Sequence, residues 1–187
     1  MSSVYEPRED SELLAAQVRK HARGRVLDVG TGSGIQAFAA AENPAVCAVI
    51  AVDVNPLAVE RMQPRVAQWN TSHGVQITVL RSDMFSIFTD ERFDTILCNP
   101  PYLPDEDKDY DPALYGGPNG YEWSVKFLQL AKAHLAPNGQ ILFLFSSLTN
   151  RDRIDLELKR LGYHHQELSM RADFFEQLYV YRIWVDM

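Results

Sequence analysis

The tetrapeptide Asn99-Pro100-Pro101-Tyr102 has the residue types that are needed to transfer a methyl group to a planar nitrogen. An amide or aromatic NH2 group is a poor nucleophile because its lone pair is delocalised, so a catalyst must hold the hydrogens and aim the lone pair. The Asn99 side-chain oxygen can accept one hydrogen and the Pro100 carbonyl the other. Pro101 keeps Pro100 extended, and Tyr102 can stack on the planar group. These four candidate catalytic residues would act by positioning rather than as a strong base.

A glycine-rich turn, Asp28-Val29-Gly30-Thr31-Gly32-Ser33-Gly34, follows the first predicted strand. Glycines allow a sharp turn and a close approach to a ligand. A dinucleotide fingerprint would need its third glycine at position 35, which is Ile35, so an oxidoreductase is a distant alternative. An acid inside the strand suits a ligand that carries an ammonium or sulfonium group. Asp28, Gly30, Gly32 and Gly34 are therefore candidate cofactor-binding residues.

Further candidates for cofactor binding end the next two predicted strands. Asp53 can accept hydrogen bonds from both hydroxyls of a ribose. Asp83 can accept from an adenine amino group, and Met84 can pack on the ring. Each acid alone would read as a solvated loop residue. Their shared place, at the carboxyl ends of successive strands where open α/β sheets bind ligands, predicts S-adenosyl-L-methionine as the cofactor.

Short apolar runs alternate with segments of helical spacing, which predicts βαβ units and a parallel sheet buried on both faces. Asn55-Pro56 is a typical helix start, and Pro137-Asn138-Gly139 is a typical helix stop. We expect an α/β fold: a doubly wound, seven-stranded, mainly parallel sheet with a C-terminal antiparallel hairpin. The expected strands are 25–29, 46–54, 75–80, 93–98, 139–145, 163–171 and 178–185, and the expected helices are 9–20, 34–42, 56–70, 121–136 and 150–161.

Length and composition limit the classes of protein. The 187 residues predict one domain, 1–187. The net charge of −7 argues against a protein that binds nucleic acid through bulk positive charge. Two cysteines, Cys47 and Cys98, are too few for a disulfide framework, and we expect no metal site. No signal peptide or membrane span is expected, so the predicted location is cytoplasmic.

These motifs resemble amino-group methyltransferases with an (Asn/Asp)-Pro-Pro-(Tyr/Phe) signature. The segment Tyr5-Glu6-Pro7-Arg8-Glu9-Asp10-Ser11-Glu12-Leu13-Leu14 is similar to HemK/PrmC-type release-factor glutamine methyltransferases, particularly their eukaryotic and archaeal branch. The resemblance runs from about residue 4 to the hairpin. It implies methylation of the glutamine in the Gly-Gly-Gln loop of a peptide chain release factor. It also implies that Ser11, in the N-terminal helical segment 1–24, closes over the methionine end of the cofactor. The further contacts it implies are Asp28, Gly30, Asp53, Asp83, Met84 and Asn99.

The resemblance also bears on partners. Bacterial members carry an additional N-terminal recognition domain, for which we expect no room in this chain. The third strand, 75–80, is expected at an open sheet edge, where a small zinc-binding activator subunit would bind by strand addition and contact Trp69. The acidic loop 105–111 would favour a basic peptide. The alternatives are an adenine amino-group methyltransferase acting on DNA or RNA, and a non-catalytic scaffold subunit.

Overall fold

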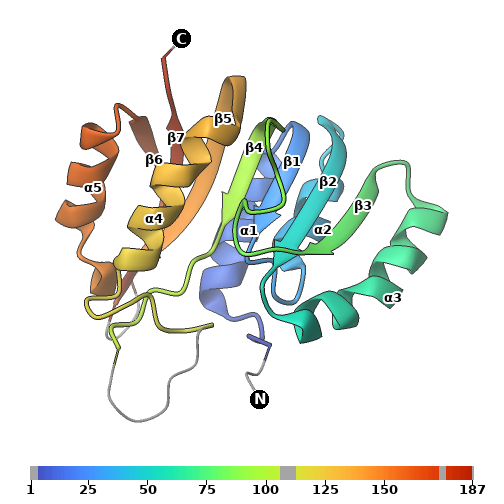
Figure 1. Ribbon diagram of the computed structural model, residues 1–187, viewed down its shortest axis with the longest axis horizontal. Coiled ribbons are helices and arrows are strands. Elements are labelled where there is room, and N and C mark those ends of the chain that lie inside the picture. Colours follow the sequence, from blue (N-terminus) through green and yellow to red (C-terminus); the bar gives the residue numbers. More distant parts are fainter. Residues whose placement is uncertain (1–3, 106–112, 173–175, 187) are drawn as a thin grey trace.

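The computed structural model describes residues 4–105, 113–172 and 176–186, which form one mixed sheet flanked by helices (Figure 1). The strands are β1 Gly24–Val29, β2 Val46–Asp53, β3 Gln76–Arg81, β4 Phe93–Cys98, β5 Leu135–Ser146, β6 His164–Ala172 and β7 Gln177–Trp184. The helices are α1 Glu9–His21, α2 Ile35–Ala41, α3 Pro56–Ser72, α4 Glu122–Ala131 and α5 Arg151–Arg160, with 3₁₀ turns at Lys132–His134 and Ser147–Thr149. Within these ranges, no helix is both long enough and apolar enough to cross a bilayer.

The strand order is β3-β2-β1-β4-β5-β7-β6. Strands β1 to β5 pair in parallel, and β7 pairs antiparallel with both β5 and β6. The predicted doubly wound sheet with a C-terminal antiparallel hairpin is thereby confirmed. From β1 the chain adds β2 and β3 on one side and then crosses to add β4 on the other side. A ligand crevice is expected at this switch point, beyond the carboxyl ends of β1 and β4.

Each face of the sheet has its own apolar core. Leu14 of α1, Ala40 of α2 and Met62 of α3 pack on one face. Phe127 of α4 and Leu158 of α5 pack on the other. Helices α4 and α5 lie in front of the sheet in Figure 1, and α1 and α2 lie behind it. Burial on both faces explains why the central strands read as nearly continuous apolar runs.

The two helix signals read from the sequence had different outcomes. Asn55 caps α3 as predicted, since its side-chain oxygen accepts from the Leu57 amide at 3.0 Å. The predicted helix over 121–136 is wrong at its end, because α4 stops at Ala131 and residues 137–139 lie inside β5. There the pairing with β4 shifts between Phe93 and Thr95. A Cβ on Gly139 would lie 2.9 Å from the Phe93 carbonyl oxygen, so close strand approach requires this glycine.

Strand β3 forms one edge of the sheet, as predicted, but α3 covers part of it. The Asn70 side chain accepts from the Ile77 amide at 2.9 Å and donates to the Ile77 carbonyl at 2.8 Å. Trp69 donates to the Val75 carbonyl at 3.0 Å and packs on Phe38. Trp69 is half-buried in this position, so its contact with a partner stays a prediction. The Ile77 side chain is buried in the core and is not free at the edge.

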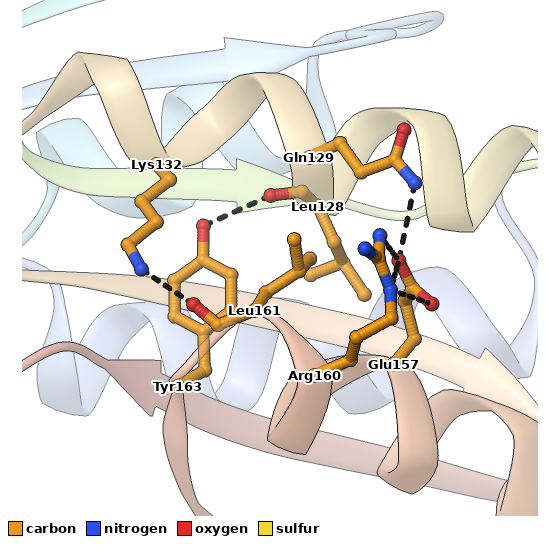
Figure 2. Close-up of polar contacts among 7 residues, drawn as sticks. All are labelled: Leu128, Gln129, Lys132, Glu157, Arg160, Leu161 and Tyr163. Carbon is orange, nitrogen blue, oxygen red and sulfur yellow. Dashed lines mark hydrogen bonds and ion pairs between the residues drawn. The ribbon is translucent and has the colours of Figure 1, made fainter.

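Polar contacts join α4 to α5 (Figure 2). The Glu157 carboxylate, 1% exposed, accepts from Gln129 of α4 at 3.1 Å and from Arg160 Nε at 3.0 Å. Two further bonds end on backbone carbonyls, from the Tyr163 hydroxyl to Leu128 and from the Lys132 ammonium to Leu161. These contacts hold α4 and α5 together on this face of the sheet. Trp123 of α4 lines the cavity described below.

Candidate active site

A cavity of about 310 Å³ opens at the carboxyl ends of the parallel strands. It is lined by residues that follow β1, β2, β3 and β4, together with residues from the N-terminal segment and α4. Seven of the residues proposed from sequence for cofactor binding line it: Ser11, Gly30, Gly32, Asp53, Asp83, Met84 and Asn99. Asp28 and Gly34 do not line this cavity.

The glycines of the β1–α2 turn have two different roles. Gly30 and Gly32 have φ values of 71° and 52°, and a Cβ built on Gly30 would meet no atom within 4 Å. A side chain there would project into the cavity, so the missing side chain leaves space for a ligand. Gly34 has φ 85° and lies at the start of α2, where a Cβ would lie 2.6 Å from Met62 Cε. Gly34 is therefore required for packing.

Asp28 lies beneath this turn. Its side chain is buried, and Oδ2 accepts from the Thr31 hydroxyl at 2.6 Å. Burial raises the pKa of the Asp28 carboxyl to about 7; the Thr31 hydrogen bond opposes the rise and the nearby Asp53 charge adds to it. Asp28 thus shapes the turn from below and places a titratable charge under the cavity floor.

Asp53 is tied to the turn from the neighbouring strand. Oδ2 accepts from the Gly32 amide at 2.8 Å, and Oδ1 accepts from the Asn55 amide at 2.8 Å. Burial raises the pKa of Asp53, and the Asn55 and Gly32 amide bonds counteract this. Each carboxylate oxygen can accept a second hydrogen bond. Asp53 can therefore hold the turn in shape and still receive the two hydroxyls of a ribose.

The segment after β3 supplies another wall. Met84 is buried with φ 48°, and the Ser82 hydroxyl donates to the Met84 carbonyl at 3.0 Å, which stabilises this tight turn. Asp83 remains exposed on the cavity wall, 3.9 Å from the Lys126 ammonium. Trp123 lines the same cavity. The sequence reading missed Trp123 because its spacing within α4 is that of an ordinary apolar face.

All four residues of the Asn99-Pro100-Pro101-Tyr102 motif line a second cavity of about 490 Å³. Asn99 and Pro101 line both cavities, so the motif lies at their junction. Tyr102 is half-buried, and its amide donates to the Leu114 carbonyl at 3.1 Å. In the acidic loop 105–111, residues 106–111 lie outside the described residues, and Asp105 is exposed.

The N-terminal segment closes the junction. Val4 and Tyr5 line both cavities, and Ser11 lines the first. The Gln36 side-chain amide donates to the Ser11 carbonyl at 2.9 Å and so fixes the start of α1 against α2. Asp10 is buried and accepts from Asn99 Nδ2 at 2.9 Å. Asp10 belongs to the N-terminal segment that resembles the family, but the sequence alone assigns it no role, because 89 residues separate it from Asn99.

Two buried acceptors on the walls of the first cavity test whether the residues fit the expected cofactor. Asn99 Oδ1 and Gln36 Oε1 have no hydrogen-bond partner within the described parts of the chain. Buried polar atoms without partners are rare in native proteins, and a bound ligand commonly satisfies them. A ligand with an ammonium group, ribose hydroxyls and an adenine amino group would supply a donor to Gln36 Oε1, whereas Asn99 Oδ1 lies where the first cavity meets the second. The residues present therefore fit S-adenosylmethionine.

The sheet order, the glycine turn and the acids at successive strand ends define the class: an S-adenosylmethionine-dependent methyltransferase with the class I fold. The methyltransferase small domain model matches residues 5–174. The "Putative protein N5-glutamine methyltransferase" of Methanocaldococcus jannaschii is 37% identical, over 97% of this chain and 91% of that protein. The chain therefore belongs to the methyltransferase small domain family.

Other relatives agree with this assignment. The release factor glutamine methyltransferase of Geobacter sulfurreducens is 32% identical over 75% of this chain and 52% of that protein, so the chain spans about half the length of this relative. The Mtq2–Trm112 complex of E. cuniculi, described as methylating the eRF1 translation termination factor, contains a chain with the same fold. It superposes with a TM-score of 0.75 at 24% identity, covering 97% of this chain and 98% of that one.

Proposed function

We propose that this chain methylates the side-chain amide nitrogen of a glutamine, in the Gly-Gly-Gln loop of a peptide chain release factor. The observation that carries the proposal is the unpartnered Asn99 oxygen at the junction of the two cavities. This oxygen can accept a hydrogen bond from an NH2 group at the place where the methyl donor and the methyl acceptor would meet. The identity of the methyl acceptor, a glutamine of a release factor, is suggested by the names of the relatives. A translation factor as substrate supports a cytoplasmic location for the enzyme.

The motif would act by orienting the acceptor. The cofactor supplies a methyl group on a positively charged sulfur. Asn99 Oδ1 accepts one hydrogen of the glutamine NH2 and the Pro100 carbonyl accepts the other, which turns the nitrogen lone pair toward the first cavity. Tyr102 packs on the amide plane; burial raises the pKa of its hydroxyl, so it stays neutral. The N–C bond would form as the bond between the methyl carbon and the sulfur breaks, the sulfur would leave as a neutral thioether, and the nitrogen would lose one proton to solvent. Such positioning can supply most of the rate.

The charges around the second cavity favour a peptide over a phosphate chain. Glu6, Asp10 and Glu176 line it together with Arg8 and Arg61. Arg61 lies 3.7 Å from Glu6, so this cation already faces a carboxylate. A mixed lining of this kind does not form the positive stripe that nucleic-acid backbones require.

A small partner subunit at β3 belongs to the same proposal. Ile77 directs its amide and carbonyl to Asn70 at the outer edge. Backbone groups alternate in direction along a strand, so Val79 and Arg81 also face outward, beyond the part that α3 covers. Leu80, 38% exposed, adds apolar surface there. By contrast β6, at the other edge, is polar and carries a bulge between Glu167 and Ser169, both protective features. The resemblance makes a zinc-binding activator the expected partner.

Transfer of radiolabelled methyl groups tests the function. The purified chain, alone and with a small zinc-binding activator subunit, is given a release factor, the same factor with its loop glutamine changed to alanine, and an adenine-containing oligonucleotide. We expect labelling of the first substrate only. Labelling of the oligonucleotide alone would identify an adenine methyltransferase, and no labelling under any condition would favour a scaffold. Asn99→Ala should lose nearly all turnover and keep cofactor affinity within about tenfold, because positioning acts on turnover.

Val79→Pro tests the partner edge. Proline removes one outward amide and is tolerated at strand edges, whereas Ile77→Lys would place a charge in the core. We expect Val79→Pro to abolish co-purification with the activator and to leave cofactor binding unchanged. Val79→Thr keeps the amide and is the matched control. Complex formation by both variants would refute pairing along β3.

A further inference from the structure

Asp10 lies at the start of α1 in an environment unusual for an acid in a first helical turn. It is 3% exposed, whereas Glu9 and Glu12 of the same turn face solvent. Acids at helix N-termini ordinarily stabilise the helix dipole from an exposed position. Burial of a carboxylate costs free energy unless hydrogen bonds compensate it. The burial of Asp10 therefore calls for a specific set of donors.

Three donors surround the Asp10 carboxylate. Asn99 Nδ2 donates to Oδ2 at 2.9 Å, while the Tyr5 hydroxyl and the Ser11 hydroxyl donate to Oδ1 at 3.1 and 3.3 Å. Burial, and then the charge of Asp10, raise the pKa of Tyr5, so its hydroxyl keeps its proton and donates. One carboxylate oxygen is thus held by the N-terminal segment and the other faces the motif after β4.

We propose that Asp10 is a positioning residue that fixes which way round the Asn99 amide stands. An asparagine amide can rotate by half a turn and exchange its oxygen with its nitrogen at nearly the same positions. An ionised carboxylate only accepts hydrogen bonds, so Asp10 holds the nitrogen end of Asn99. The oxygen end is then left at the cavity junction, where Asn99 Oδ1 has no partner within the described residues.

This inference concerns the same site as the proposed function and rests on transfer to an NH2 group. The opposite orientation would present an NH2 donor to the NH2 group of the acceptor, and the two would repel. Tyr5 and Ser11 both line the first cavity and both hold Asp10. The N-terminal segment therefore borders the cofactor site and, through Asp10, also orients the acceptor site.

A first experiment measures the orientation without requiring turnover. In ¹⁵N spectra of the full chain, the Asn99 side-chain NH2 signals are assigned by their loss in Asn99→Asp. We expect one of the two protons to be shifted downfield and slow to exchange in the parent and in Glu9→Ala. Asp10→Ala should remove both properties. Equal Asn99 spectra in the parent and in Asp10→Ala would overturn the proposal.

Kinetics separate positioning from a structural role. We expect Asp10→Ala to lower kcat by about ten- to hundredfold, the range of one hydrogen bond to a charged group, with KM for the acceptor and cofactor affinity changed less than about threefold. Glu9→Ala, an exposed acid of the same turn, should match the parent. Loss of cofactor affinity in parallel with kcat, or a kcat near that of the parent, would contradict the proposal.

A charge exchange gives the sharpest test. Asn99→Asp alone sets two carboxylates face to face, and we expect nearly complete loss of transfer. In Asp10→Asn/Asn99→Asp, the new amide can accept from Tyr5 and donate to Asp at position 99, which leaves one carboxylate oxygen at the junction. We expect kcat at least tenfold above that of Asn99→Asp. A double variant no better than the single one overturns the proposal. Failure of the parent to methylate a release factor would refute only the proposed substrate, since the spectra test the orientation independently.

Discussion

The same side chain, aspartate, serves four different purposes around this site because its surroundings differ. Asp10 is buried among three donors, Asp28 is buried beside the Thr31 hydroxyl and an Ala37 backbone amide, Asp53 bonds two backbone amides, and Asp83 is exposed near a lysine. Asp28 is fully buried, and this burial raises the pKa of its carboxyl to about 7. Environment rather than residue type therefore decides what each of these aspartates does at the site.

Asp28 should make the stability of the ligand-free protein depend on pH. The folded state retains a proton up to a pKa of about 7, whereas the unfolded carboxyl releases it near 4. Stability should therefore fall as pH rises through this window, by up to about 1.4 kcal/mol per pH unit. Asp28→Asn should remove this slope and be more stable than the parent at pH 8. Urea unfolding at pH 5 and pH 8 measures it, with the exposed Asp90→Asn as control; identical slopes would refute the assignment.

Asp53 should determine cofactor affinity. Loss of a charged acceptor for ribose hydroxyls costs roughly 1.5–3 kcal/mol, so Asp53→Ala should weaken S-adenosylmethionine binding by about one to two orders of magnitude. Titration calorimetry checks this, and circular dichroism checks that the fold persists. Asp90→Ala, on an exposed loop, should bind as the parent does. Unchanged affinity in Asp53→Ala would exclude Asp53 from the cofactor site.

At the scale of elements, α3 does more than cover the sheet. Its last turns carry Asn70, whose amide replaces a neighbouring strand at Ile77 by both donating and accepting. Edge strands with free backbone groups invite pairing with other chains. Helix α3 thus limits the open part of the β3 edge to its carboxyl-terminal half.

Asn70→Ala should weaken this edge. Two hydrogen bonds to Ile77 are lost, and we expect the free energy of unfolding to fall by roughly 1–2 kcal/mol. Hydrogen exchange at the Ile77 amide should become faster, while Gln68→Ala, an exposed change on the same helix, should have no effect there. Equal protection of Ile77 in all three proteins would show that Asn70 does not cap the edge.

The sequence predicted most elements, the mainly parallel sheet and the C-terminal hairpin because local signals agreed with one another. Asn55 and Pro56 placed the start of α3, and alternation of apolar runs gave the parallel sheet. Contacts between distant segments could not be read in this way. The Asp10–Asn99 bond and the Asn70 cap depend on tertiary placement. The tripeptide Pro137-Asn138-Gly139 is equally compatible with the end of a helix and with an irregularity in a strand, so its composition alone does not distinguish the two. The candidate site residues at strand ends were predictable because topology alone brings such ends together.

At the scale of the whole molecule, the two helical faces are held differently. The α1–α3 face packs mostly through aliphatic side chains, whereas α4 and α5 also share the buried Glu157 network (Figure 2). The hydrogen bond from Arg160 lowers the pKa of Glu157. Because the pKa of Glu157 is lower in the folded state, this group stabilises the fold at pH values above its unfolded-state pKa near 4.5. The stabilisation is lost as the pH falls through the folded-state pKa.

Glu157→Gln should therefore destabilise the protein at neutral pH, by roughly 1–2 kcal/mol, and make it less sensitive to acid than the parent. Thermal unfolding at pH 7 and pH 4 measures both effects. Asp152→Asn, an exposed acid on the same helix, is the control and should unfold as the parent does at pH 7. A parent and Glu157→Gln pair with the same acid sensitivity would refute this role.

The shared wall between the two cavities also has a consequence for inhibition. Asn99, Pro101, Val4 and Tyr5 border both spaces, so the two cavities adjoin along these residues in the described part of the chain. A bisubstrate compound, with an adenosyl amino acid joined through one carbon to the nitrogen of a glutamine-containing peptide, would occupy both spaces at once. Its halves would bind with the high effective concentration of a short linker, and selectivity would come from the peptide half.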